Sequence, residues 1–366
     1  MNPRMNIAFF GSSLVSAYWN GAATYYRGII RALHELGYRT TFYEPDAFDR
    51  QQHRDIPDPD YAAIEVYSAE NESEVLEAVS RARGADLVVK ASGVGVHDGL
   101  LEQAVLDLQS PECLVFFWDV DAPATLERMQ NDPNDSFRAL VPEYDMILTY
   151  GGGTPVVEAY EALGARRCVP VYNALDPTTH HPVSSDPRFD GDLGFLGNRM
   201  PDREMRVWEF FFHPARQLQD RRFLIGGNGW ETNVLESGNV TYLGHVYTRD
   251  HNAFNCTPLS VLNITRESMV RYGYSPPTRV FEAAGAGACL ITDAWEGIEM
   301  FLEPKRECLV AQSGDDVIEV LRELDAGRAR AMGEAARERV LSEHTYAHRA
   351  AELDALLGEA GARAAA

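Results

Sequence analysis

NIAFFGSSLVSAYWNGAATYYRGIIRALHELGYRTTFY, residues 6–43, decides the fold, because it contains a strand, a helix and a second strand in succession. The apolar residues 6–11 predict the first strand. Apolar residues recur at helical spacing between positions 29 and 36, and Gly37 is a typical helix stop. Residues 39–43 predict the second strand. Parallel sheets are built from strand–helix–strand units of this kind.

The same alternation of strand and helix continues to the end of the chain. In the first half, further strands are expected at residues 86–89, 113–118, 146–149 and 168–172. In the second half, they are expected at residues 193–196, 222–225, 240–243, 259–263, 289–292 and 308–310. Short apolar strands that alternate with helices predict parallel sheets covered on both faces. We therefore expect an α/β fold of two doubly wound, Rossmann-like domains.

A polar, proline-bearing stretch from residue 176 to about residue 190 separates the two halves. It predicts an N-terminal domain over residues 1–175 and a second domain over residues 176–345. A chain of 366 residues is long enough for two domains of roughly 150 to 200 residues each. In open parallel sheets ligands bind beyond the carboxyl ends of the strands, so two such domains predict a ligand cleft between them.

Composition and charge exclude several classes of function. The formal charge of −22 repels phosphate backbones and the basic residues form no run, so nucleic acid is not an expected partner. No stretch approaches the roughly 18 apolar residues of a membrane span, and no signal-peptide pattern follows Arg4. We expect no integral membrane segment and a cytoplasmic location. The five widely separated cysteines are interpreted as small buried hydrophobes. The oligomeric state stays open.

Residues 275–289, SPPTRVFEAAGAGAC, predict a loop that enters a helix. Ser275 is placed to cap this helix, and the amides of its first turn, around Thr278, would form an anion site suited to a diphosphate. Glu282 lies about one turn further on, where a carboxylate can accept hydrogen bonds from the two hydroxyls of a ribose. The alternative is a capped helix with a solvated glutamate, and spacing alone does not choose between them.

Arginines follow several of the expected strands of the second half. Guanidinium groups suit diphosphates because they are permanently charged and bind in a bidentate manner. In an acidic chain, arginines gathered after strand ends favour an anion-binding role, although a single one is more often a surface residue. The candidates for this role are Arg199, Arg203, Arg266 and Arg279.

The loop after the first strand also leads into a helix, but it lacks the G-x-G-x-x-G fingerprint of dinucleotide enzymes, as does the triple glycine at residues 151–153. A nicotinamide or flavin enzyme is therefore disfavoured, and no cofactor is expected. Side chains of this first loop either line a pocket for an acceptor or pack as ordinary loop residues. The candidate acceptor-binding residues are Ser12, Trp19, Asn20, Tyr26 and Arg27.

Asp119 and Asp121 follow an apolar strand that ends at Trp118, so we expect them at a carboxyl end, projecting toward the cleft. They would act as a general base, or orient the hydroxyls of an acceptor. A D-x-D metal site is a weaker alternative, and helix capping is a third. The ten histidines show no H-x-x-H or H-E-x-x-H pattern, so we expect no metal.

Six motifs together resemble a known family over nearly the whole chain. They are residues 18–28, 118–126, 202–203, 262–266, 274–287 and 295–297. The chain resembles the two-Rossmann-domain (GT-B) glycosyltransferases, and among them the proteins related to spore maturation protein CgeB. The resemblance implies a metal-independent transfer of sugar from a nucleoside-diphosphate sugar, a co-substrate held by the C-terminal domain. The acceptor, whether a small molecule, a glycan or a peptide, stays unidentified.

The resemblance also assigns parts to particular residues. A glutamate at the position of Glu282 holds the ribose in this family, and the final segment, residues 346–366, resembles a helix that crosses back to the N-terminal domain. Many retaining members carry a second glutamate eight positions earlier, where this chain has Tyr274, so the stereochemistry stays open. Two other functions fit the same pattern: a nucleotide-sugar epimerase or hydrolase of the same fold, and a non-catalytic nucleotide-sugar-binding protein.

Overall fold

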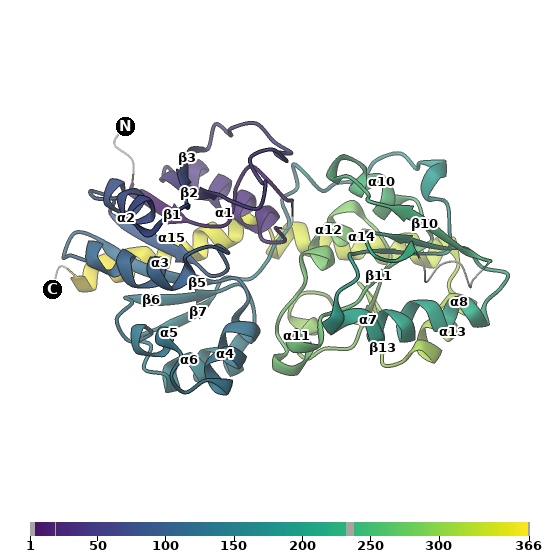
Figure 1. Ribbon diagram of the computed structural model, residues 1–366. Coiled ribbons are helices and arrows are strands. Elements are labelled where there is room, and N and C mark those ends of the chain that lie inside the picture. The colour runs from purple at the N-terminus through teal and green to yellow at the C-terminus, as the bar shows by residue number, and fades with distance from the viewer. Residues whose placement is uncertain (1–3, 19, 232–237, 365–366) are drawn as a thin grey trace. The chain divides into compact units, whose positions relative to one another are not determined.

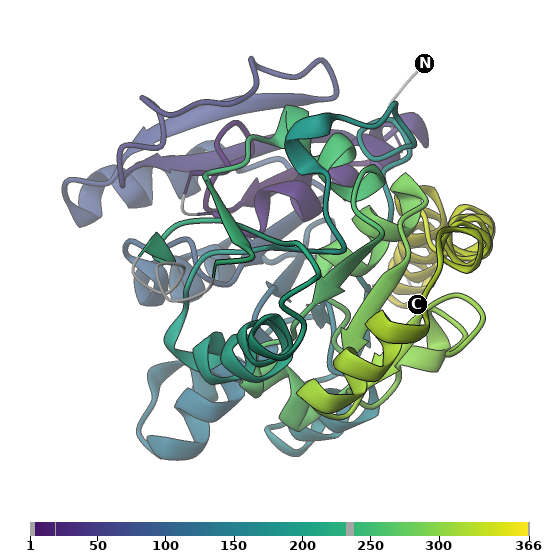
Figure 2. The same ribbon diagram turned by 90° about the vertical axis from the view of Figure 1, so that its right-hand side faces the viewer.

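The computed structural model describes residues 4–18, 20–231 and 238–364, and it divides the chain into two compact units (Figure 1). Unit 1 comprises Met1–Asn173 together with Tyr346–Ala366, and unit 2 comprises Ala174–Thr345. Each unit is built on one parallel sheet, with helices on both of its faces (Figures 1 and 2). The predicted α/β fold of two doubly wound units is confirmed.

Unit 1 contains a seven-stranded sheet in the order β3-β2-β1-β4-β5-β6-β7 within the described residues. Its strands are β1 (Asn6–Phe10), β2 (Arg39–Asp46), β3 (Ala62–Ser68), β4 (Leu87–Ala91), β5 (Leu114–Asp119), β6 (Met146–Thr149) and β7 (Cys168–Pro170). Its helices are α1 (Ala23–Glu35), α2 (Glu72–Arg81), α3 (Asp98–Ala104), η1 (Val105–Leu108), α4 (Ala122–Asn131), α5 (Ser136–Leu140), α6 (Gly153–Ala162) and α15 (Tyr346–Ala364).

Unit 2 contains a six-stranded sheet in the order β10-β9-β8-β11-β12-β13, again within the described part of the chain. Its strands are β8 (Leu193–Leu196), β9 (Phe223–Gly226), β10 (Val240–Gly244), β11 (Ser260–Asn263), β12 (Leu290–Asp293) and β13 (Leu309–Ala311). Its helices are η2 (Pro187–Phe189), α7 (Pro201–Val207), η3 (Trp208–Phe212), α8 (His213–Gln217), η4 (Thr248–Asp250), α10 (His251–Cys256), α11 (Glu267–Tyr272), α12 (Thr278–Ala286), η5 (Ile298–Met300), α13 (Gly314–Glu323) and α14 (Ala326–Glu343).

The central strands are buried because both of their faces are covered. Every residue of β4 is buried, and so is every residue of β9, β11 and β12. In the edge strand β3, by contrast, only Tyr67 is buried. An edge strand with one wet face needs no continuous apolar run, and this explains why the sequence pattern did not predict β3.

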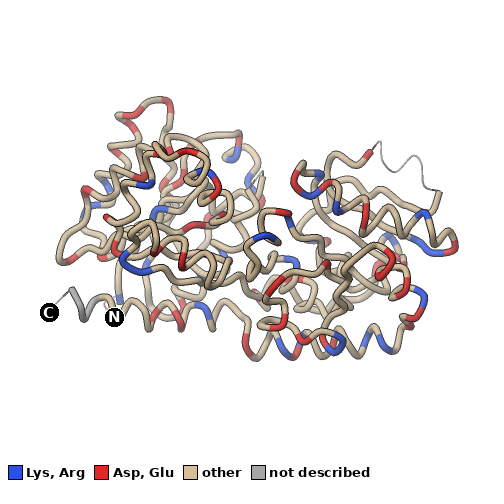
Figure 3. Tube along the Cα trace, turned by 90° about the horizontal axis from the view of Figure 1, so that it is seen from below, with Lys and Arg blue, Asp and Glu red and all other residues tan. Residues whose placement is uncertain are grey.

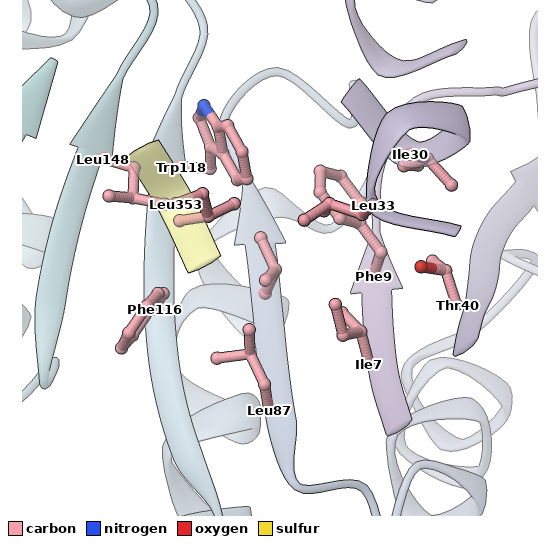
Figure 4. A pocket seen from close by; sticks show the side chains of 11 residues that line it. Ile7, Phe9, Ile30, Leu33, Thr40, Leu87, Phe116, Trp118, Leu148 and Leu353 are labelled. Atoms are coloured by element: carbon pink, nitrogen blue, oxygen red, sulfur yellow. The ribbon is translucent and has the colours of Figure 1, made fainter. Parts of the chain in front are cut away.

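Helix α15 is the last helix of the chain, and it packs on the sheet of unit 1. Its Leu353 lines a small apolar pocket together with Trp118, Leu148 and residues of β1 and α1 (Figure 4). Gly28 of α1 permits this approach, since a Cβ there would lie 2.2 Å from the ring of Tyr346. Residues 346–364 thus complete the core of unit 1 although they follow unit 2 in the sequence.

Acidic and basic residues are interspersed along the trace, and acidic positions predominate (Figure 3). Among the helices of the described residues, none has the length and apolarity needed to cross a membrane.

Candidate active site in unit 2

The order of strands places two loops of unit 2 side by side. The chain winds outward from β8 in one direction through β9 and β10, and then returns to the other side of β8 with β11. In such sheets the loops beyond the carboxyl ends of these two central strands diverge and leave a site for ligands. Arg203 lies in α7, which follows β8, and Arg266 follows β11. Two of the predicted anion-binding residues therefore flank this switch point.

The guanidinium groups of Arg203 and Arg279 both lie over the same aromatic ring. The guanidinium carbons lie 5.6 Å and 5.4 Å from the ring centre of Phe195, in β8. Arg203 donates to the carbonyl of Asn198 and Arg279 to that of Leu196. Neither forms an ion pair with any carboxylate in the described parts of the chain. Two neighbouring cations that form no ion pair within the described residues favour an anionic ligand.

Burial and mutual repulsion act on this pair of cations. Burial and, second to it, the nearby charge of Arg279 lower the pKa of Arg203 to about 10. Burial also lowers the pKa of Arg279. Nearby carboxylates that form no ion pair with the two arginines oppose these changes, Asp202 and Asp293 at Arg203, and Glu282 and Asp293 at Arg279. The protein keeps both groups at a cost in stability, and a bound anion would relieve this cost.

Asp293, which the sequence analysis did not identify, anchors the elements that carry the arginines. It is fully buried at the end of β12. It accepts a hydrogen bond from Arg206 of α7 at 2.7 Å, and from the amide and hydroxyl of Thr265 at 2.9 Å and 3.0 Å. Arg206 is one turn from Arg203, and Thr265 precedes Arg266. One carboxylate therefore positions both loops at the switch point.

Arg266 and Arg199 both pair with a carboxylate, so their charges are less available to a ligand than those of unpaired arginines. The Nε of Arg266 donates to Asp202 at 2.6 Å, so its charge is already matched by a carboxylate. Arg199 is exposed and pairs with Glu204 at 2.5 Å. Of the four arginines, Arg203 and Arg279 are therefore the ones whose charges are most available to a ligand.

Helix α12 begins at Thr278, as expected, but its cap differs from the prediction. The N-cap residue is Pro277, and no side chain caps the first turn. The Ser275 hydroxyl instead donates to the carbonyl of Gly273 at 2.9 Å, and Ser275 is buried. The prediction that Ser275 caps the helix is wrong, because Pro276 and Pro277 separate it from the first turn. The uncapped turn remains suited to an anion.

Glu282 lies one turn into α12 and is half-buried. Its carboxylate stands 3.9 Å from Nε2 of His180, and a ring nitrogen of His251 is also close, so that one ligand atom from each residue lies within 4.8 Å of the others. The sequence analysis missed both histidines, because they lie far from Glu282 and from each other in the sequence.

Tyr274, which stands where many retaining members of the resembled family have a glutamate, contacts another carboxylate. Its hydroxyl donates to Glu296 at 2.9 Å, and its backbone has a positive φ of 46°. Gly297 has no side chain to obstruct the tyrosine, since a Cβ there would lie 2.3 Å from the ring. The sequence has a tyrosine where a carboxylate would be expected, and in the structure this tyrosine is hydrogen-bonded to the carboxylate of Glu296.

In unit 1, Asp119 ends β5 as predicted, but its side chain is fully buried and does not project outward. It accepts hydrogen bonds from Ser92, Thr125 and Tyr160 and from the amide of Asp121. Burial raises its pKa above the ordinary value. The expectation of Asp119 at a cleft is corrected to that of a buried organiser of the turn into α4. Asp121, the N-cap residue of α4, is half-buried.

The candidate acceptor residues of unit 1 bond mainly to their own loop. Ser12 donates to Asn20 at 2.9 Å, and Asn20 donates to the carbonyls of Ser13 and Ser16. Arg27 forms a bidentate pair with Asp55 at 2.9 Å and 2.8 Å. Tyr26 is buried against other aromatic rings. Trp19 lies outside the described residues.

Comparison with solved structures gives the class of fold. Sucrose-phosphate synthase from Thermosynechococcus elongatus superposes with a TM-score of 0.73 at 15% identity, over 98% of this chain and 100% of that one. An alpha-glucosyltransferase in complex with UDP and a 13-mer DNA gives 0.69 at 12% identity, over 97% and 99%. The Anabaena protein HepE, in complex with UDP and glucose, gives 0.66 at 12% identity, over 97% and 100%. The chain has the GT-B fold of glycosyltransferases.

The sequence itself also matches a family model over part of its length. Residues 203–355 match the family described as glycosyl transferase-like. The matched region begins at Arg203 and includes Arg266, Arg279 and Glu282. No curated protein sequence matches the chain.

Proposed function

We propose that this protein is a glycosyltransferase that takes a sugar from a nucleoside-diphosphate sugar held by unit 2. The observation that carries the proposal is the pair Arg203 and Arg279, two cations that form no ion pair among the described residues, beside the uncapped start of α12. A diphosphate matches two adjacent guanidinium groups and a helix N-terminus. The glycosyl transferase-like region and the GT-B fold support the same function.

Each residue then has a part in the transfer. Arg203 and Arg279, with the first amides of α12, hold the diphosphate and stabilise the charge that it develops as it leaves. Arg266 contributes from the edge of this site, where Asp202 orients it. Glu282 accepts hydrogen bonds from the ribose hydroxyls. Because solved structures of the same fold hold UDP, a UDP-sugar is the first donor to test.

On the acceptor side, we propose that unit 1 binds the acceptor and that Asp121 orients or deprotonates its hydroxyl. Asp121 takes this part in place of Asp119, because Asp119 is enclosed by its own partners. The proposal includes transfer without a metal cofactor, membership of the CgeB-related group and a cytoplasmic location.

Calorimetry with UDP tests the donor half of the proposal. Wild-type protein should bind UDP, and Glu282→Ala should weaken binding roughly 10- to 100-fold, because hydrogen bonds to a charged group contribute about 1.5–3 kcal/mol. Glu319→Ala is the matched control, since Glu319 is an exposed glutamate of α13. Equal affinities of wild type and Glu282→Ala would remove the core of the proposal.

Incubation with donors distinguishes transfer from the two alternatives. Turnover of a UDP-sugar that depends on an added acceptor supports a transferase. Complete conversion of the donor without any acceptor would instead identify an epimerase or hydrolase of the same fold. Binding of UDP without turnover of any donor and acceptor pair would indicate a non-catalytic binding protein.

A further inference from the structure

Three side chains from separate parts of unit 2 converge beside the donor site. His180 is buried and precedes η2, His251 is the first residue of α10, and Glu282 lies in α12. One ligand atom from each lies within 4.8 Å of the others. Two imidazoles and one carboxylate are a ligand set that zinc sites use. The proposed function assigns a part only to Glu282.

Neighbouring groups fix which nitrogen of His180 carries the proton. The Thr179 hydroxyl donates to the carbonyl of Asp176 at 3.1 Å, so its oxygen can accept from Nδ1 of His180 at 3.0 Å. Nδ1 then carries the proton, and Nε2 carries the lone pair that faces Glu282. The distance of 3.9 Å from Nε2 to the carboxylate is too long for a hydrogen bond, so the two groups share no proton.

His251 is held in the same manner. Its Nε2 lies 3.2 Å from the carbonyl oxygen of Val246, and since a carbonyl can only accept, Nε2 carries the proton and Nδ1 the lone pair. Hydrogen bonds from the outer nitrogen to protein oxygens are the usual means by which metal-binding histidines are oriented.

We propose that His180, His251 and Glu282 bind a divalent transition-metal ion of the zinc type, and that this ion and the donor nucleotide exclude one another. In a tetrahedral site with metal–ligand bonds of about 2.0 Å, ligand atoms are about 3.3 Å apart. A small inward shift of the three side chains would satisfy that geometry. The metal would occupy the carboxylate that a ribose needs. Metal binding is independent of the proposed function, whereas the exclusion rests on it.

Titration with Co²⁺ tests the metal site directly. Chelator-treated wild type should bind one Co²⁺ with the visible absorption of a tetrahedral site and without a thiolate charge-transfer band, because the set contains no cysteine. His180→Ala and His251→Ala should each weaken Co²⁺ binding at least tenfold, because loss of an outer-shell partner alone typically weakens metal binding tenfold or more. His213→Ala is the control, because His213 is an exposed histidine that pairs with Asp315.

The metal site is refuted if His180→Ala and His251→Ala bind Co²⁺ as well as wild type does. If either variant fails to fold by circular dichroism, Glu282→Gln replaces it, since that change removes a ligand from a half-buried side chain. Thiolate bands in the wild-type spectrum would place the ion at cysteine and would equally contradict the proposal.

Competition tests the exclusion. With free Zn²⁺ held by a metal buffer, so that chelation by the diphosphate does not matter, saturating UDP should weaken Zn²⁺ binding at least tenfold. Simultaneous binding with unchanged affinities would overturn the exclusion and leave the metal site standing. Absence of UDP binding at any Zn²⁺ concentration, including none, would instead overturn the proposed function, and the Co²⁺ result would still decide the metal site.

Discussion

Asp119 and Asp293 end the equivalent strands of the two units, β5 and β12, and both are fully buried. Each accepts a hydrogen bond from a hydroxyl group in the loop after the neighbouring strand: Ser92 donates to Asp119 at 2.8 Å, and Thr265 donates to Asp293 at 3.0 Å. Their other partners differ. Asp119 has neutral donors, whereas Asp293 pairs with the guanidinium of Arg206.

This difference separates a structural carboxylate from one that supports a site. The donors to Asp119 are neutral side chains of unit 1, and their hydrogen bonds join β5 to α4 and α6. The ion pair of Asp293 fixes α7, and α7 presents Arg203, which forms no ion pair with a carboxylate in the part of the chain that the structure describes. The same fold position therefore stabilises one unit and, in the other, positions positive charge for a ligand. Substitutions at and around the two aspartates can test whether their roles differ in this way.

The largest loss of stability is expected for Asp293→Ala. Removing one partner of a buried ion pair leaves the other charge without compensation and typically costs about 3–5 kcal/mol. Arg206 would lose its carboxylate, and the elements that carry Arg203 and Arg266 would lose their anchor. Urea unfolding measures the loss, and UDP calorimetry should show weaker binding as well. Unchanged UDP affinity in a folded variant would contradict the anchoring role.

Asp119→Ala should cost less, about 2–3 kcal/mol, because it leaves only neutral buried donors without an acceptor. Its UDP affinity should stay within about twofold of the wild-type value, since Asp119 belongs to unit 1. The same two measurements check it. A loss of stability equal to that of Asp293→Ala would mean that the charge of Arg206 does not distinguish the two positions.

Arg279→Met should weaken UDP binding roughly 10- to 100-fold, because it removes charged hydrogen bonds worth about 1.5–3 kcal/mol. The ligand-free variant should be as stable as wild type or more stable, since the change removes a cation that repels Arg203. Calorimetry and thermal unfolding check both effects. Arg199→Met is the matched control, because Arg199 is an exposed arginine of the same unit, and it should change neither. Equal effects of the two variants on UDP binding would contradict the proposed site.

The smallest effect concerns pH. Burial raises the pKa of Asp119 and of Asp293 above 3.8, although Arg206 opposes the change at Asp293. A carboxyl with a higher pKa in the folded chain holds its proton more tightly there. Stability therefore falls as pH rises from 3.8 to the folded pKa, and the cost persists above it.

Arg206→Met should raise the pKa of Asp293 further, so that stability continues to fall up to a higher pH. The additional loss in the free energy of unfolding should be about 1.4 kcal/mol for each unit by which this pKa rises. Tyr160→Phe, which removes a neutral donor from Asp119, should cause a smaller additional loss. Urea unfolding between about pH 4 and about pH 7 measures both, since this range begins near the ordinary carboxyl pKa. Equal additional losses of stability in the two variants would show that the charge on Arg206 matters no more than a neutral donor.

Most of the fold was predictable because strand and helix periods are local properties. All the expected strands are present, and their bounds in the structure differ from the expected ones by only a few residues. The strand β3 was missed, because its half-exposed pattern at the edge of the sheet carries little apolar signal. The helix entrance at Thr278 was found from its prolines, but the cap was assigned to Ser275, whose hydroxyl instead binds the carbonyl of Gly273.

The sequence by itself determined the α/β architecture and drew attention to Arg203, Arg279 and Glu282, because residue types and spacing along one segment suffice for both. Only the tertiary structure decided which polar groups already have partners. It turned Asp119 inward, paired Arg27 with Asp55, and brought His180 and His251 to Glu282. Partners of this kind come from segments distant in sequence, so their availability for a ligand depends on packing that no local pattern records.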